Sequence, residues 1–348
     1  MSTFYQCGEG YRLDPYTLEQ FGTESWVPLD GISAHPKVDE ATGELLFFNY
    51  STHAPYMHYG VVGPDNKLKH YIPIPLPGPR LPHDMAYTRK YSIFADLPLF
   101  WDPEALAKGR HATRFHRDMP TRFAIVPRYG SPDQIKWFEA DPTYVLHWMN
   151  AWEEGDEVVL DGYFQEQPVP GALEVNHPDP RMGHLMAFVD ENSFKPKLHR
   201  WRFNMKTGAC TEGHLDDRIL EFGTFNQERA GTKTRYAYST TTEPGWFLFN
   251  GAVKHDHETG QSQSLSFGEG RYGSESPFAP RIGAVEEDDG YLVSFITDMV
   301  EDRSECVLID CQNFEAGPVC RIILPHRISS GTHAAWADGP RLRAAQAG

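Results

Sequence analysis

Four histidines that lie far apart in the chain each sit in a short local phrase that suits a metal ligand: His35, His83, His147 and His333. Neutral imidazole is a good ligand for iron, copper, zinc and nickel. Residues so distant in sequence can bind one ion only if the chain returns repeatedly to one place. A β-propeller does this, because each of its blades brings the chain back to a central axis. The four histidines therefore predict a propeller that holds a metal ion on its axis.

The composition agrees with a large all-β fold. The 348 residues include 30 glycines and 27 prolines, which suits many short strands joined by turns. We expect residues 1–348 to form one domain, since large β architectures reach this size as single units. The formal net charge is −16, and lysine and arginine form no cluster. This balance argues against nucleic acid and anionic lipid as partners.

The cysteines and the first residues bear on location. The chain has an odd number of cysteines without the paired spacing of a zinc site, which predicts free thiols in a reducing cytoplasm: Cys7, Cys210, Cys306, Cys311 and Cys320. Residues 1–20 have neither a basic start nor an apolar run, so we expect no signal peptide. No stretch approaches the 18 apolar residues that a membrane-spanning helix needs. The expected location is therefore cytoplasmic, and the sequence does not set the oligomeric state.

A recurring turn phrase divides the chain into hairpins. An acidic or amide residue, two variable residues and then Thr-Gly occur at 39–43, 204–208 and 256–260. The first side chain can bond to the backbone ahead of it, and the glycine supplies the positive φ that closes the turn. Helix is scarce. One short helix is expected at 102–109, with Asp102 as its cap and a glycine after its end.

The proline-rich run at 72–80 leads directly to His83. Proline has no amide donor and disfavours helix before it, so this run is expected to be an extended loop. An apolar loop beside a metal ligand could form a substrate entrance or a lip in peripheral contact with a membrane. A packed connection between two strands is the alternative interpretation.

The phrases around the histidines resemble, in order and along nearly the whole chain, those of the carotenoid cleavage oxygenases. This family includes carotenoid, apocarotenoid and lignostilbene dioxygenases and the retinal pigment epithelium isomerase. The matching phrases are YRLDPYTLE at 11–19, AHPKVD at 34–39, PHDMA at 82–86, HWMNAWE at 147–153 and GTH at 331–333. Members usually have a longer stretch before the first ligand phrase, so the resemblance implies a form that is short at its N-terminus.

The resemblance implies a seven-bladed β-propeller with iron(II), Fe²⁺, held by His35, His83, His147 and His333. It also implies three glutamates that accept hydrogen bonds from the ligand rings, as metal-bound histidines usually require. The matching positions are Glu9, Glu221 and Glu275, of which Glu9 matches less well. Aromatic residues near the ligands could line a substrate tunnel or could be blade core: Phe100, Trp101 and Trp148.

The implied activity is that of an oxidoreductase. It is an iron(II)-dependent dioxygenase that cleaves one C=C bond of a carotenoid or apocarotenoid with O2 and gives two carbonyl products. No catalytic residue beyond the metal ligands is implied, and the partner is an apolar conjugated small molecule. A stilbene-cleaving dioxygenase and an inactive, truncated propeller fragment are the alternatives. A metal-dependent propeller hydrolase is a further rival, but such sites generally include carboxylate and amide oxygens among the ligands.

Overall fold

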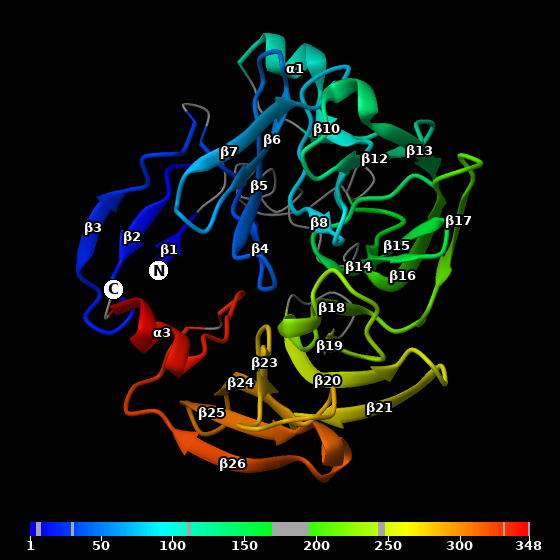
Figure 1. Ribbon diagram of the computed structural model, residues 1–348. Helices are drawn as coiled ribbons and strands as arrows, with labels where there is room; N and C mark the ends of the chain where they lie inside the picture. Colours follow the sequence, from blue (N-terminus) through cyan, green and yellow to red (C-terminus); the bar gives the residue numbers. More distant parts are fainter. Residues whose placement is uncertain are drawn as a thin grey trace. The chain divides into compact units, whose positions relative to one another are not determined.

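The computed structural model describes residues 1–4, 8–28, 31–109, 113–168, 195–242, 248–329 and 331–346, and strands dominate it (Figure 1). Strands form where β-branched and aromatic residues are frequent and one face is buried. β15 (Glu157–Phe164) is an example, because Val158, Val159 and Leu160 are all buried. The described helices are short: α1 (Pro103–Ala107), α3 (Gly339–Gln346) and the 3-10 turns η1 (Pro132–Gln134), η3 (Gln227–Arg229) and η4 (Cys311–Ala316).

The contacts divide the chain into two compact units. Unit 1 comprises residues 1–217 and 230–233, and unit 2 comprises 218–229 and 234–348. Each unit is built of antiparallel sheets whose strands mostly follow one another in the chain, which is the pattern of propeller blades.

Unit 1 holds four such sheets and one small hairpin. The sheets are β1 (Ser2–Thr3), β2 (Tyr11–Leu13) and β3 (Gln20–Thr23); β4 (Lys37–Asp39), β5 (Glu44–Tyr50), β6 (Met57–Val62) and β7 (Leu68–Pro73); β8 (Ala86–Tyr87), β9 (Tyr91–Asp96), β12 (Thr121–Pro127) and β13 (Lys136–Ala140); and β14 (Trp148–Glu154), β15, β16 (Lys197–Asn204) and β17 (Cys210–His214). The hairpin pairs β10 (Leu99–Trp101) with β11 (Thr113–Phe115).

Unit 2 holds two sheets. The first consists of β18 (Leu220–Thr224), β19 (Tyr236–Thr242), β20 (Phe249–Asp256) and β21 (Gln261–Ser266); the second of β22 (Arg271–Tyr272), β23 (Phe278–Pro280), β24 (Gly290–Asp298), β25 (Arg303–Asp310) and β26 (Pro318–Ile323).

The blade number differs from the expectation. Across the described ranges, six sheets have three or more strands, so the prediction of seven blades is wrong. A blade takes about 40–50 residues, and 348 residues would therefore be enough for seven. However, the described residues between β9 and β12, 97–109 and 113–120, contain β10, α1 and β11 instead of blade strands. The turn phrases in the amino-acid sequence do not show how many residues lie in such connections.

A core cluster in unit 1 joins the third sheet to the fourth. Phe123 of β12 lies against the rings of Trp148, Trp201 and Phe203, at centroid distances of 4.9–5.8 Å. Gly162 is the cross-strand partner of Trp148, and a Cβ at this glycine would lie 2.5 Å from the indole ring. Only glycine therefore lets the indole pack flat on β15. Unit 2 has its own core, which includes Tyr238, Phe278 and Phe314.

Several local predictions are confirmed. The three turn phrases close with Gly43, Gly208 and Gly260 at φ of 70–79°, and the leading Asp or Asn side chains accept backbone N–H bonds. The Asp102 carboxylate caps α1 by accepting from the amide of Ala105 at 2.8 Å.

The structure also bears on the predictions for the proline-rich run and the cysteines. β7 continues to Pro73, and Ile74 is fully buried, so the run is a packed connection at this point. Four cysteines are free thiols, whereas Cys7 lies outside the described residues. In the described ranges, no helix has the length and apolar character needed to cross a membrane.

Candidate metal centre

Three of the four predicted ligands occupy equivalent places in three successive sheets of unit 1. His35 comes two residues before β4, His83 three before β8 and His147 one before β14. Each of these strands is the first of its sheet and lies at the sheet's edge. Repetition of one structural pattern therefore delivers an imidazole at the same point of each sheet. This explains how residues from three distant segments meet.

The three rings converge. The Nε2 atoms of His35 and His83 are 3.0 Å apart, and the ring of His147 lies 5.1 and 5.2 Å from the other two ring centroids. The candidate ligand atoms of all three lie within 4.8 Å of one another. Two nitrogens that each bind one ion at about 2.1 Å in adjacent coordination positions are separated by about 3 Å. The observed spacing therefore fits a shared transition-metal ion.

Burial favours the neutral form of His35. Burial lowers the pKa of His35 to about 2, and the nearby Asp84 carboxylate offsets this only in part. His147 is also buried. A neutral imidazole has the lone pair that a metal needs. The three donors bring no negative charge, so a bound dication would keep its electrophilic character.

The fourth predicted ligand, His333, lies in unit 2 with one of the predicted glutamates. The Glu275 carboxylate Oε2 accepts from Nδ1 of His333 at 3.1 Å and from the amide of Ala334 at 3.0 Å. The ring of Phe222 contacts the imidazole edge to face at 5.4 Å. A carboxylate on Nδ1 fixes the tautomer and leaves Nε2 to a metal. The arrangement is that of an oriented ligand, although the side chain is exposed.

The other predicted glutamates have different surroundings. Glu221 of β18 is fully buried, and its Oε2 accepts from the amide of Phe222 at 2.5 Å. Glu9 is exposed, and its carboxylate accepts from the hydroxyl of Tyr11 at 3.0 Å. This contact gives Glu9 a tyrosine partner where the sequence predicts a histidine. Its proposed part in the site stays a prediction.

The predicted tunnel residues lie in two environments. Trp148 belongs to the core cluster of unit 1, and its indole N–H donates to the carbonyl of Asp84 at 3.2 Å. It is therefore blade core, which was the alternative interpretation. Phe100 of β10 is stacked at 4.1 Å on His116, and the Arg80 guanidinium lies 4.1 Å from its ring. Trp101 pairs with Thr113 in the same hairpin.

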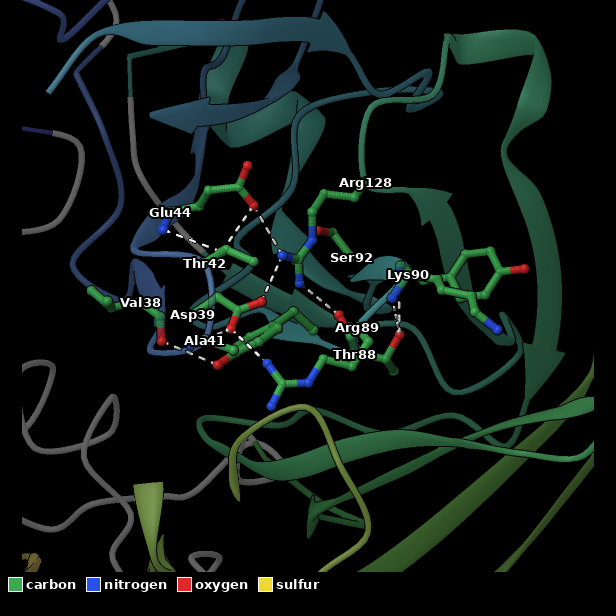
Figure 2. A network of polar contacts seen from close by, with 12 residues as sticks. Val38, Asp39, Ala41, Thr42, Glu44, Thr88, Arg89, Lys90, Ser92 and Arg128 are labelled. Carbon is green, nitrogen blue, oxygen red and sulfur yellow. Dashed lines mark hydrogen bonds and ion pairs between the residues drawn. The ribbon is translucent and has the colours of Figure 1, made fainter. Parts of the chain in front are cut away.

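A buried polar network that the sequence did not reveal supports two of the ligand segments (Figure 2). Arg128, just after β12, donates to Asp39 at 2.6 Å, to Glu44 at 3.0 Å and to the carbonyl of Thr88 at 2.8 Å. Asp39 ends β4, which follows His35, and Thr88 follows β8, which follows His83. Asp39 also pairs with Arg89 at 2.7 Å. The Arg128 guanidinium thus links β4, which follows His35, to the residue after β8, which follows His83.

Fold and site together define a class: an all-β protein of propeller type with converging histidines that could hold a metal ion. Comparison with known proteins specifies it further. The model of the family described as retinal pigment epithelial membrane protein matches residues 2–338, and the chain belongs to this family.

Three individual proteins show what this chain is similar to. A carotenoid 9,10(9',10')-cleavage dioxygenase of Crocus sativus is 35% identical over 328 residues, which are 89% of this chain and 58% of that protein. An isoeugenol monooxygenase of Pseudomonas nitroreducens is 29% identical over 96% of this chain and 72% of its own length. The crystal structure of Pseudomonas brassicacearum lignostilbene dioxygenase matches with a TM-score of 0.84 and 28% identity, over 97% of this chain and 72% of that one. The chain thus spans less than two thirds of the length of the plant relative.

Proposed function

We propose that this chain is an iron(II)-dependent dioxygenase that cleaves one C=C bond of a carotenoid or apocarotenoid with O2 and releases two carbonyl products. The observation that carries the proposal is the convergence of three imidazoles from three successive sheets. The relatives add the reaction class, because several of them are named as carotenoid cleavage dioxygenases. An all-imidazole set argues against a hydrolase, whose metal ligands generally include oxygens.

The proposed ligand set is His35, His83, His147 and His333. In this proposal Glu275 orients His333, and Glu221 and Glu9 are the further carboxylates that support ligand rings. Bound iron would supply the activation of dioxygen, which no protein side chain can perform. The protein's own contribution is to keep the histidines neutral by burial, to fix their orientation and to hold an apolar substrate beside them. Proton transfer by a side chain is not required.

A stilbene or phenylpropene substrate is the second candidate. A lignostilbene dioxygenase and an isoeugenol monooxygenase match this chain over nearly its whole length. Both names describe substrates with a double bond conjugated to a phenol ring. The proposed cytoplasmic location and a single functional domain over residues 1–348 are consistent with either substrate class.

The test is aerobic incubation of the iron-loaded protein with a carotenoid, an apocarotenoid and a stilbene, with products identified by mass and oxygen uptake followed in parallel. The proposal predicts two aldehyde or ketone products whose masses add up to substrate plus O2. Products only from the stilbene would favour the second candidate. A protein that retains iron but consumes no oxygen with any substrate class would contradict both, and one that retains no iron would indicate an inactive fragment.

A further inference from the structure

One buried carboxylate lies at the junction of all three ligand segments of unit 1. Asp84 directly follows His83, and its side chain is 1% exposed. It is not one of the proposed metal ligands. Its contacts nevertheless reach the chain next to each of the three converging histidines.

Each contact of the Asp84 carboxylate is with a residue one or two positions after a ligand. Oδ1 accepts from the amide of Met85 at 2.7 Å and from Nζ of Lys37 at 2.7 Å. Oδ2 accepts from the amide of Trp148 at 2.9 Å. Met85 is two residues after His83, Lys37 two after His35 and Trp148 one after His147. The Trp148 indole also donates to the Asp84 carbonyl, so two bonds tie this pair.

This arrangement has a geometric and an electrostatic consequence. A common acceptor fixes the three segments relative to one another, and backbone amides make stiff donors because they carry no side-chain rotamers. Charge-assisted bonds of this kind are roughly twice as strong as neutral ones. The Asp84 carboxylate is also a buried negative charge, whereas the histidine ligands bring no negative charge. A buried dication without a negative charge nearby costs free energy.

We propose that Asp84 is a positioning residue for the metal centre: it assembles the His35, His83 and His147 segments before metal binds and supplies counter-charge to the bound ion. The proposal rests on the proposed metal centre, but not on the identity of the substrate. Asp84 acts through the ligands and the backbone and touches no reacting atom.

Asp96 provides a matched control. It is likewise a buried carboxylate of unit 1, and it accepts from Arg80 at 2.5 Å and from Nε of Arg122 at 3.0 Å. Arg122 lies in β12 and Arg80 three residues before His83, and neither is among the residues that Asp84 bonds. Asp84→Asn and Asp96→Asn therefore remove the same charge from comparable buried sites, and both should lower stability. Only Asp84→Asn should change the metal centre.

The first measurement uses the full chain and titrates cobalt(II) and iron(II) anaerobically into the wild type and both variants. We expect Asp84→Asn to weaken metal affinity at least tenfold and to alter the visible absorption bands of cobalt, which report coordination geometry. We expect Asp96→Asn to stay within twofold of the wild type, with unchanged bands. A folded Asp84→Asn variant with wild-type affinity and bands would overturn the proposal. A wild type that binds neither metal would instead contradict the proposed function.

The second measurement needs no variant. Hydrogen exchange of the wild type without metal should show the amides of Met85 and Trp148 strongly protected, because the carboxylate holds both before any ion binds. If these two amides exchange as fast as exposed loop amides until metal is added, Asp84 does not assemble the site and the proposal fails. This arm remains decisive even if Asp84→Asn does not fold.

Discussion

The two units present their predicted ligands in different ways. In unit 1, the rings of His35, His83 and His147 converge, and each histidine comes just before a strand. Asp84 and Arg128 join these segments through buried charge-assisted bonds. In unit 2, His333 is exposed and contacts the Glu275 carboxylate and the ring of Phe222. Three predicted ligands thus belong to a frame of buried bonds, whereas the fourth is an oriented side chain that is exposed and more lightly supported. This difference suggests a division of labour among the predicted ligands. Losses in unit 1 should therefore cost more than losses in unit 2.

The largest effect is expected from removing a converging ligand. His83→Ala takes away a ring whose Nε2 is 3.0 Å from that of His35 and leaves only two of the three converging rings of unit 1. We expect metal content in the purified protein to fall at least tenfold and cleavage activity to be lost. Metal analysis by mass spectrometry measures the first and product formation the second. His53→Ala changes an exposed histidine and should leave both unchanged. Equal metal content in the two variants would rule out His83 as a ligand.

The next effect concerns the buried ion network. Arg128→Met removes one of the two guanidinium partners of Asp39, which is fully buried. Breaking a buried pair typically costs about 3–5 kcal/mol, and because Arg89 still pairs with Asp39 the lower end, about 3 kcal/mol, applies. We expect a loss of this size in the free energy of unfolding, measured by urea titration of the metal-free protein. The control is Arg235→Met in unit 2, which breaks a partly exposed pair with Asp256 and should cost much less. Similar losses in the two variants would show that the buried network around Arg128 contributes no more to the free energy of unfolding than a partly exposed ion pair does.

What the sequence could predict depended on the range of the interaction. Turns and α1 were predictable, because Asp39, Asn204, Asp256 and Asp102 bond to backbone only two or three residues ahead. The blade number was not, because the local signal for the helix at 102–109 does not show how many residues the connection between β9 and β12 takes from the blades. Arg128 was missed because it lies 89 residues from Asp39. Asp84 is adjacent to a predicted ligand, yet its role depends on amides from a segment 64 residues away.

Lowering the pH should reduce the free energy of unfolding, because Asp39 becomes protonated. Burial alone would raise the pKa of this carboxyl, but hydrogen bonds from Arg128 and the Ala41 amide and the nearby guanidinium charges hold it below its ordinary 3.8. The unfolded chain therefore takes up the proton first as the pH falls. The stability from this group is fully present above about pH 4 and is lost as the pH falls from there toward the lower pKa of the folded state.

The size of this loss is set by the difference between the pKa of Asp39 in the folded and unfolded chain, about 1.4 kcal/mol for each pKa unit. Urea titrations between pH 5 and pH 3 would measure it. The same titrations on Asp39→Asn isolate the contribution of this residue, since the variant cannot titrate there. An acid dependence equally steep in the variant would assign the loss to other carboxyls.

The smallest effect should come from the lightly supported ligand of unit 2. Glu275→Gln keeps an oxygen that can accept from His333 or from Ala334, but it removes the charge that favours the Nδ1–H tautomer. Replacing such a supporting carboxylate typically costs 10–100-fold in metal affinity. We expect the lower end, about tenfold, because the exposed ring can also bond to water. Competition with a chelator measures the affinity, and Glu315→Gln makes the same charge change at an exposed site of unit 2. If Glu275→Gln weakened binding as much as His83→Ala, the fourth ligand would belong to the same frame as the other three, and the division of labour between the two units would be wrong.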